Sequence, residues 1–136
     1  MQFDIFMETS EIINKCKKHV FLIEDSTDVK NLAQHYFEET GFEMDSAADG
    51  EEALLKLRHL KVLPGLILLD LKMPRMDGFQ FRLQQELDSE LSQIPVVVMS
   101  ADHYTEVHAI RMGAHGYIKK PFTSDSLIST AKKYCS

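Results

Sequence analysis

The sequence predicts an α/β fold, a doubly wound (βα)5 three-layer sandwich built on a five-stranded parallel sheet. Short apolar runs alternate along the chain with stretches of helical spacing. Each run is apolar at successive positions, as expected of strands that helices cover on both faces of a sheet. Turn residues separate the elements, and right-handed crossovers would place helices on both faces.

The first strand and helix are predicted between His19 and Gly41. Residues 19–24 form a short, apolar and β-branched run, which is typical of a buried strand. The next segment has an apolar helical face, made by Val29, Leu32, Ala33 and Tyr36. Ser26 or Thr27 would cap the start of this helix, and Gly41 follows its end.

The second and third units repeat this alternation. A weaker strand at 42–47 and a turn at Asp49 and Gly50 precede a helix that ends near Leu60. Pro64 and Gly65 interrupt the chain before an apolar third strand at 66–69. Apolar residues spaced i, i+4 and i+8 predict a third helix, namely Phe79, Leu83 and Leu87.

The last two units complete the predicted sheet. A strand at 96–99 precedes a short helix at 104–112, and a fifth strand at 116–119 precedes the final helix, which is marked by Leu127, Ile128 and Ala131. Residues 18–136 thus form one domain. Residues 1–17 form a leader outside it, with a short helix as one alternative.

Composition and charge exclude several classes of protein. The formal net charge is −6, from 21 acidic and 15 basic residues, which argues against direct nucleic-acid binding. No apolar run reaches the roughly 18 residues that span a bilayer, and the start of the chain lacks the features of a signal peptide. Cys16 and Cys135 are expected to be reduced thiols rather than a disulfide. We therefore expect a cytoplasmic protein.

Polar side chains follow the predicted strands at the edge where ligands bind in open parallel sheets. They are Glu24, Asp25, Asp70, Ser100, Lys119 and Lys120. Three clustered carboxylates would raise one another's pKa, and a hard cation such as Mg²⁺ removes that conflict. A carboxylate beside Mg²⁺ can attack a phosphoryl group, while a lysine and a hydroxyl bind its oxygens. Each residue alone could be a helix cap or a solvated charge, so the prediction depends on their coincidence.

At this point the sequence resembles the receiver domain of two-component response regulators, a family with a flavodoxin-like fold. The resemblance extends from Lys18 to the end of the chain. It is carried by five motifs: LIEDS (22–26), ADGEEAL (48–54), LILLDLKMPRMDG (66–78), VVVMSA (96–101) and GYIKKPF (116–122). The order and spacing of the five motifs together are highly specific for this family, and no single motif would suffice to identify it.

The resemblance implies a magnesium site and a phosphoacceptor. Asp70 matches the phosphoacceptor, and Glu24 with Asp25 matches the acidic pair that binds Mg²⁺. Asp25 would be a direct ligand, Glu24 would act mostly through water, and the backbone carbonyl of Lys72 would complete the protein ligands. The pair is Glu-Asp where the family commonly has Asp-Asp, a change that keeps the necessary oxygens.

The resemblance also implies a conformational switch. Ser100 matches the switch hydroxyl, with serine in place of threonine, and Tyr117 matches the switch aromatic residue. Lys120 matches the phosphate-pairing lysine, because it directly precedes Pro121, and the bond between them is expected to be cis. Lys119 would point to the opposite face of the sheet.

Lys72 and Asp102 lie two residues after the phosphoacceptor and the switch hydroxyl, where side chains flank the phosphoryl group in receivers. Their opposite charges would pair across the mouth of the site and obstruct the water that hydrolyses the phosphate. The alternative is two solvent-exposed side chains, since exposed ion pairs contribute only about 0–1 kcal/mol.

These expectations describe a stand-alone signalling switch rather than a conventional enzyme. A sensor histidine kinase or histidine phosphotransfer protein would phosphorylate Asp70, and a separate output protein would bind the face formed by the fourth helix, fifth strand and fifth helix. The domain would be a monomer or weak homodimer. One alternative is a Mg²⁺-dependent phosphohydrolase, although Lys72 stands where such enzymes carry a second aspartate. Another is a flavodoxin-like binding module, although no glycine-rich loop follows the first strand.

Overall fold

The computed structural model describes the backbone of residues 15–135 and the side chains of residues 18–135. Five parallel strands form one sheet in the order β2-β1-β3-β4-β5, which confirms the predicted fold class. The elements are β1 Lys15–Ile23, α2 Thr27–Glu39, β2 Glu43–Ala47, α3 Gly50–His59, β3 Leu63–Asp70, α4 Gly78–Glu86, the 3-10 helix η1 Leu91–Gln93, β4 Val96–Ser100, α5 Thr105–Arg111, β5 Gly116–Lys119 and α6 Ser124–Cys135.

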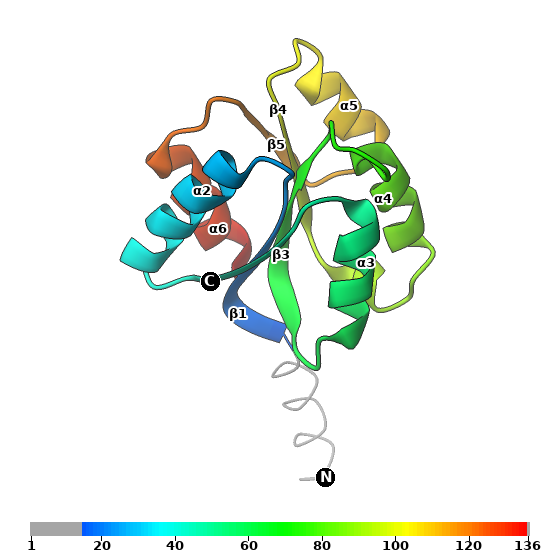
Figure 1. Cartoon of the computed structure of the whole chain (residues 1–136), viewed down its shortest axis with the longest axis horizontal. Helices are drawn as coiled ribbons and strands as arrows, with labels where there is room; N and C mark the ends of the chain where they lie inside the picture. The colour runs from blue at the N-terminus through cyan, green and yellow to red at the C-terminus, as the bar shows by residue number, and fades with distance from the viewer. Residues whose placement is uncertain (1–14, 136) are drawn as a thin grey trace, which may run out of the picture.

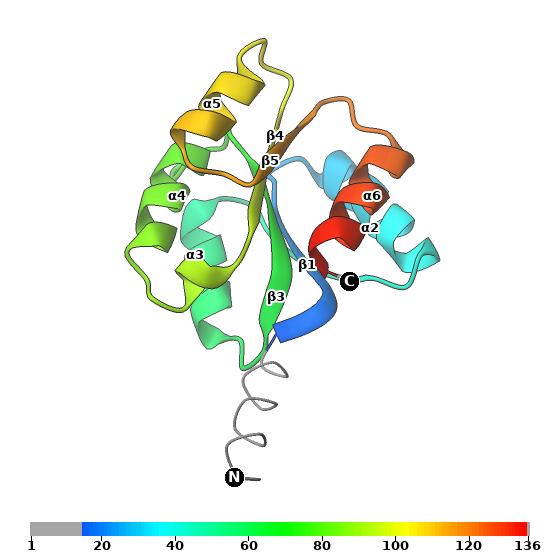
Figure 2. The same ribbon diagram turned by 180° about the vertical axis from the view of Figure 1, so that it is seen from behind.

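Alternate residues of each interior strand supply two separate cores, one on each face of the sheet. Phe21, Ile67 and Val98 point to the face covered by α3, α4 and α5. Val20 and Leu68 point to the other face, which α2 and α6 cover. Figures 1 and 2 show this division, with α2 and α6 side by side on one face of the sheet and the other three helices opposite. The strands are therefore apolar at every position because both of their faces are covered.

Two strands begin earlier than the sequence predicts. β1 begins at Lys15, four residues before His19, and the backbone of residues 15–17 is strand rather than leader. The rest of the predicted leader, residues 1–14, lies outside the described residues. β3 includes Pro64 and Gly65, which were expected to precede it. Pro64 is accommodated where the β1–β3 register is irregular, between Cys16 and Val20.

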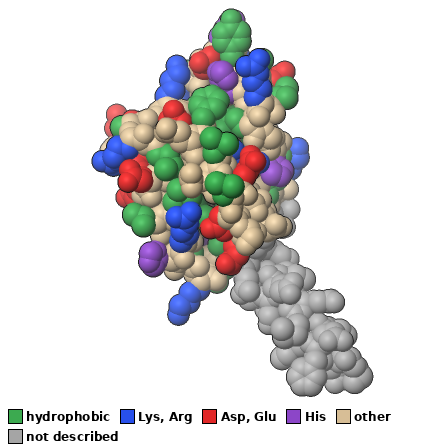
Figure 3. Space-filling view, turned by 90° about the vertical axis from the view of Figure 1, so that its right-hand side faces the viewer, with side chains coloured by type: hydrophobic (Ala, Val, Ile, Leu, Met, Phe, Trp, Pro, Cys, Tyr) green, Lys and Arg blue, Asp and Glu red, His purple; other side chains and the backbone are tan. Residues whose placement is uncertain are grey.

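Helix α4 buries a different face from the one its apolar spacing indicates. α4 buries Phe81 and Gln85 against the sheet, whereas Phe79, Leu83 and Leu87 are 40%, 64% and 80% exposed. α2 follows its prediction more closely, since Ala33 is buried and Tyr36 packs against the same core, although Leu32 is exposed. Figure 3, which shows the side of the molecule formed by α3, α4 and α5, has hydrophobic side chains scattered among charged ones. Apolar spacing thus predicts both helices correctly, but not how α4 is rotated.

Local capping fixes where the helices begin. Ser26 Oγ accepts a hydrogen bond from the amide of Val29, which confirms Ser26 rather than Thr27 as the cap of α2. Asp77 and Gln80 form a reciprocal capping box at the start of α4. These caps hold α2 and α4 directly behind the carboxyl ends of β1 and β3.

Two further expectations concern the ends of the chain. Cys135 is buried, with its Sγ 3.9 Å from the carbonyl oxygen of His19. The side chain of Cys16 lies outside the described residues, so the absence of a disulfide stays a prediction. Within residues 15–135, no helix is both long enough and apolar enough to cross a bilayer.

Candidate functional site

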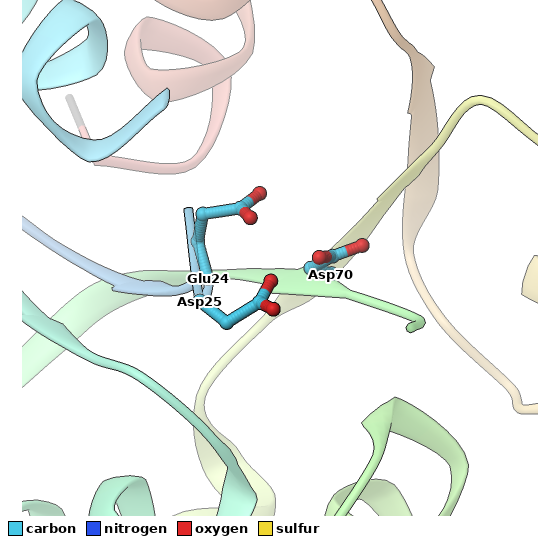
Figure 4. Close-up of side chains that lie close together, drawn as sticks. All are labelled: Glu24, Asp25 and Asp70. Atoms are coloured by element: carbon cyan, nitrogen blue, oxygen red, sulfur yellow. The ribbon is translucent and has the colours of Figure 1, made fainter. Parts of the chain in front are cut away.

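Three carboxylates meet at the carboxyl ends of β1 and β3. Each of Glu24, Asp25 and Asp70 offers an oxygen that lies within 4.8 Å of those of the other two. The two strands are neighbours in the sheet, so residues 46 positions apart arrive at one edge. Figure 4 shows Glu24 and Asp25 reaching from the end of β1 towards Asp70. The sequence prediction of an acidic cluster at this edge is confirmed.

Lys120 provides the nearest positive charge to this cluster. Its Nζ lies 2.5 Å from Oε1 of Glu24 and 3.5 Å from Oδ2 of Asp70. The second oxygen of Glu24 accepts a hydrogen bond from the amide of Ser26 at 3.0 Å. Burial nevertheless raises the pKa of Glu24, and the charge of Asp70 adds to this effect. Burial of Glu24, more than repulsion from Asp70, is therefore what the hydrogen bonds from Lys120 and Ser26 do not fully offset.

The donor set fits Mg²⁺ on chemical grounds. Carboxylate oxygens are the hard ligands that this cation prefers, and Glu24 is 1% exposed while Asp25 is open to solvent. A divalent cation would stabilise the charged form of Glu24, whose pKa is raised mainly by burial and to a smaller extent by the charge of Asp70. The backbone of Lys72 begins the loop after β3, and its amide donates to Oδ1 of Asp70 at 3.3 Å.

Ser100 and Tyr117 occupy different environments. Ser100 is buried at the end of β4, and its Oγ accepts a hydrogen bond from the amide of Asp102 at 3.0 Å. Tyr117 points outward and is 41% exposed. Its hydroxyl donates to Oε2 of Glu106 on α5 at 2.5 Å, and this bond raises the pKa of Tyr117. The structure thus brings Ser100 to the site edge and holds Tyr117 away from it.

Lys72 and Asp102 face each other with an Nζ–Oδ2 distance of 3.6 Å. The same oxygen of Asp102 lies 3.9 Å from Nε2 of His108 on α5. The amide of Tyr104 is the main cause that lowers the pKa of Asp102, and the charges of Lys72 and His108 add to it, against partial burial. The expected pairing of Lys72 with Asp102 is therefore present at the mouth of the site.

Sequence reasoning missed several partners of these residues. On α5, Glu106 accepts a hydrogen bond from Tyr117, and His108 lies beside Asp102. No spacing pattern in the sequence predicts either contact. Arg75 binds Asp49 across 26 residues of sequence. Such contacts link ordinary polar residues through the fold, so only the structure reveals them. The bond between Lys120 and Pro121 is cis, as the resemblance implied.

Comparison with known families agrees with this geometry. Residues 20–132 match the family model described as the response regulator receiver domain. Among curated proteins, the chain is 34% identical over 115 residues to a probable transcriptional regulator, ycf27, of Cyanophora paradoxa. That match covers 82% of this chain and 45% of the relative. A C4-dicarboxylate transport transcriptional regulatory protein, DctD, of Rhizobium meliloti is 37% identical over 115 residues, covering 84% of this chain and 24% of the relative.

Solved structures show the same fold. The chemotaxis protein CheY4 of Vibrio cholerae superposes with a TM-score of 0.76 at 27% identity, covering 85% of this chain and 97% of that one. A receiver domain of a signal transduction histidine kinase from Syntrophus aciditrophicus gives a TM-score of 0.77 at 29% identity, covering 87% and 89%. The chain thus spans less than half the length of the curated relatives above, but nearly the whole of these two structures.

Proposed function

Because this chain belongs to the response regulator receiver domain family, we propose that it is a phosphorylation-dependent switch whose phosphoacceptor is Asp70. A histidine kinase or histidine phosphotransfer protein is the proposed donor. The observation that carries the proposal is the convergence of Glu24, Asp25 and Asp70 beside Lys120. In-line attack by an oxygen of Asp70 would form the acyl phosphate as the N–P bond of the donor phosphohistidine breaks.

Each residue of the site has a distinct proposed part. Glu24, Asp25, Asp70 and the carbonyl of Lys72 would hold Mg²⁺, which when bound supplies charge neutralisation for the incoming phosphoryl group. Lys120 would leave Glu24 and pair with a phosphoryl oxygen, while the hydroxyl of Ser100 donates to another. The contacts of Lys120 with both Glu24 and Asp70 support this division, since its ammonium already lies within reach of the proposed phosphoacceptor.

The donor surface is proposed to lie beside Lys120. An apolar pocket of about 250 Å³ opens there, lined by Val29 and Leu32 of α2 together with Ala101, Lys120, Pro121 and Phe122. The exposed Leu32 would contact an apolar side chain of the donor next to its phosphohistidine. The output surface is proposed to be α5, β5 and α6, where Ile110 and Tyr117 are exposed.

Phosphorylation is proposed to shift an existing equilibrium in which Tyr117 points outward or inward. Glu106 stabilises the outward state through its hydrogen bond to Tyr117. Glu106→Ala should therefore raise the apparent affinity for the phosphoryl mimic beryllofluoride, by about fivefold if the bond contributes about 1 kcal/mol. Titration followed by tyrosine fluorescence measures this change. Glu106→Gln retains a carbonyl acceptor and should resemble the wild type. Equal beryllofluoride affinities in all three proteins would show that the hydrogen bond between Glu106 and Tyr117 does not stabilise the outward state.

The ion pair between Lys72 and Asp102 is proposed to lengthen the life of the acyl phosphate by obstructing the attacking water. Replacing both residues with alanine should speed dephosphorylation by up to about fivefold, the effect of an exposed pair worth at most about 1 kcal/mol. Phosphate release after removal of the donor gives the rate. The matched control replaces the remote exposed pair His35–Glu39 with alanines. An unchanged lifetime in the Lys72–Asp102 variant would exclude this gating role.

Acetyl phosphate and phosphoramidate with Mg²⁺, followed by intact mass, test the proposed function. Both should add one phosphoryl group, and a chelator should prevent the addition. Phosphoramidate tests the N–P bond that a phosphohistidine donor would present. Steady phosphate release from phosphomonoesters without an adduct would instead favour the hydrolase. If neither an adduct nor turnover is observed, both the switch and the hydrolase are contradicted, and the binding module is the alternative that is left.

A further inference from the structure

We propose that Arg75 and Asp49 form a positioning pair that holds the Lys72 segment of the β3–α4 loop in the geometry required for Mg²⁺. This inference rests on the proposed function, because it assigns the loop's contacts to the metal site. Arg75 itself would touch neither the metal nor the phosphoryl group. Its effect would pass through the backbone of residues 71–77, which connects Asp70 to α4.

Asp49 is an unusual anchor because its side chain is completely buried at the start of α3. Its Oδ1 accepts from the amide of Glu52 at 2.9 Å, as a helix cap does. Its Oδ2 accepts from Nε of Arg75 at 2.7 Å and also from Nη2. Burial raises the pKa of Asp49, but these hydrogen bonds outweigh it, so the net pKa lies below the ordinary value. The carboxylate therefore offers Arg75 a fixed, charged partner.

Arg75 adopts a backbone conformation that L-residues seldom take, with φ at +60°. Glycine would adopt it without strain, yet here an arginine occupies the position. In this conformation the guanidinium lies over Asp49 and binds it through two nitrogens. Both nitrogens donate to the same oxygen, Oδ2, and two hydrogen bonds that converge on one buried atom restrain the guanidinium more than a single bond would.

The same loop is attached at two further points. Beside Arg75, the amide of Gly50 donates to the carbonyl of Met76 at 3.0 Å. At the base of the loop, the amide of Gly78 donates to the carbonyl of Leu71 at 3.2 Å. Lys72 lies between these attachments. β3 fixes the base, so the position of the far half of the loop depends on α3, which Arg75 and Met76 reach.

Arg75→Gly provides the test, because it removes the guanidinium and also relieves the left-handed strain. Mg²⁺ affinity, measured by isothermal titration calorimetry, should weaken by about tenfold, the usual effect of losing a group that orients a ligand. The melting temperature without metal should fall, because the buried Asp49 carboxylate loses its charged partner, so Mg²⁺ affinity is compared at a temperature where both proteins are fully folded. Without metal, the ¹⁵N order parameters of the Lys72 and Met73 amides should fall. Arg75→Lys keeps the positive charge but has one nitrogen, not two, to donate to Asp49. Its Mg²⁺ affinity should therefore lie between those of Arg75→Gly and the wild type.

The matched control is Arg58→Ala. Arg58 pairs with Asp88, which also accepts backbone hydrogen bonds. Arg58 lies in the last turn of α3, at the opposite end of that helix from Asp49. Its Mg²⁺ affinity should equal that of the wild type. Unchanged affinity in Arg75→Gly, with a wild type that binds Mg²⁺, would overturn the positioning role and leave the proposed function intact. A wild type that binds no Mg²⁺ and forms no adduct would overturn the proposed function itself.

Discussion

Asp70→Asn is expected to abolish the phosphoryl adduct that acetyl phosphate and Mg²⁺ form on this chain. The amide cannot act as the nucleophile, and the two remaining carboxylates, Glu24 and Asp25, follow β1 and are the proposed metal-binding pair. Intact mass after reaction with each donor measures the result. An adduct of equal yield in wild type and variant would exclude Asp70 as the phosphoacceptor.

The fold should survive this change, so loss of the adduct can be attributed to chemistry. Asparagine has nearly the same shape and keeps the oxygen that accepts from the Lys72 amide. It also removes one negative charge beside Glu24. The metal-free melting temperature should therefore equal or exceed that of the wild type, while its rise on adding Mg²⁺ should shrink. Asp45→Asn, on edge strand β2, is the control that should retain the full adduct.

Gly78→Ala is expected to destabilise the domain by about 3 kcal/mol or more, at the upper end for overpacking. A Cβ atom at this position would lie 2.6 Å from the carbonyl oxygen of Asp70 and 2.9 Å from Cα of Leu71. Both are backbone atoms at the end of β3 and cannot move without displacing the strand. Denaturant unfolding monitored by circular dichroism measures the loss of stability.

Gly116→Ala separates this clash from the general effect of adding a methyl group. The nearest atoms to a Cβ at Gly116 lie 3.7 Å away, which is ordinary van der Waals contact. Its unfolding midpoint should therefore remain near that of the wild type. Equal stability of the two alanine variants would contradict the close approach of α4 to the end of β3.

The sequence predicts the order of the elements well because the interior strands β3 and β4 are apolar on both faces and α2, α3 and α4 begin at side-chain caps. It predicts the buried side of α4 poorly. Phe79 and Leu83 have the right spacing for a buried face, but the close contact at Gly78 turns Phe81 to the sheet instead. That contact depends on the end of β3, which no local pattern in α4 encodes.

The same distinction applies to the site. Asp70 and Glu24 are predictable because strand ends in a parallel sheet share one edge. The ion pair of Lys72 with Asp102 is predictable from the resemblance to receivers, in which side chains at these positions flank the phosphoryl group. The partners of Arg75 and Glu106 are not predictable, because they lie on other elements and any exposed charged residue has many candidate partners. These two contacts are therefore known only from the structure.

The sheet order has a consequence for amide hydrogen exchange. β1, β3 and β4 are paired on both sides, whereas β2 and β5 each have an unpaired edge within the described sheet. Interior amides should exchange only when the whole domain opens, and edge amides also through local opening. A ligand that binds only the folded chain should then slow amide exchange in β1 and β3 by the factor 1 + [L]/Kd, and in β2 and β5 by a smaller factor. Comparing exchange rates with and without Mg²⁺ would thus measure Mg²⁺ affinity from the interior amides alone. This experiment needs no phosphoryl donor.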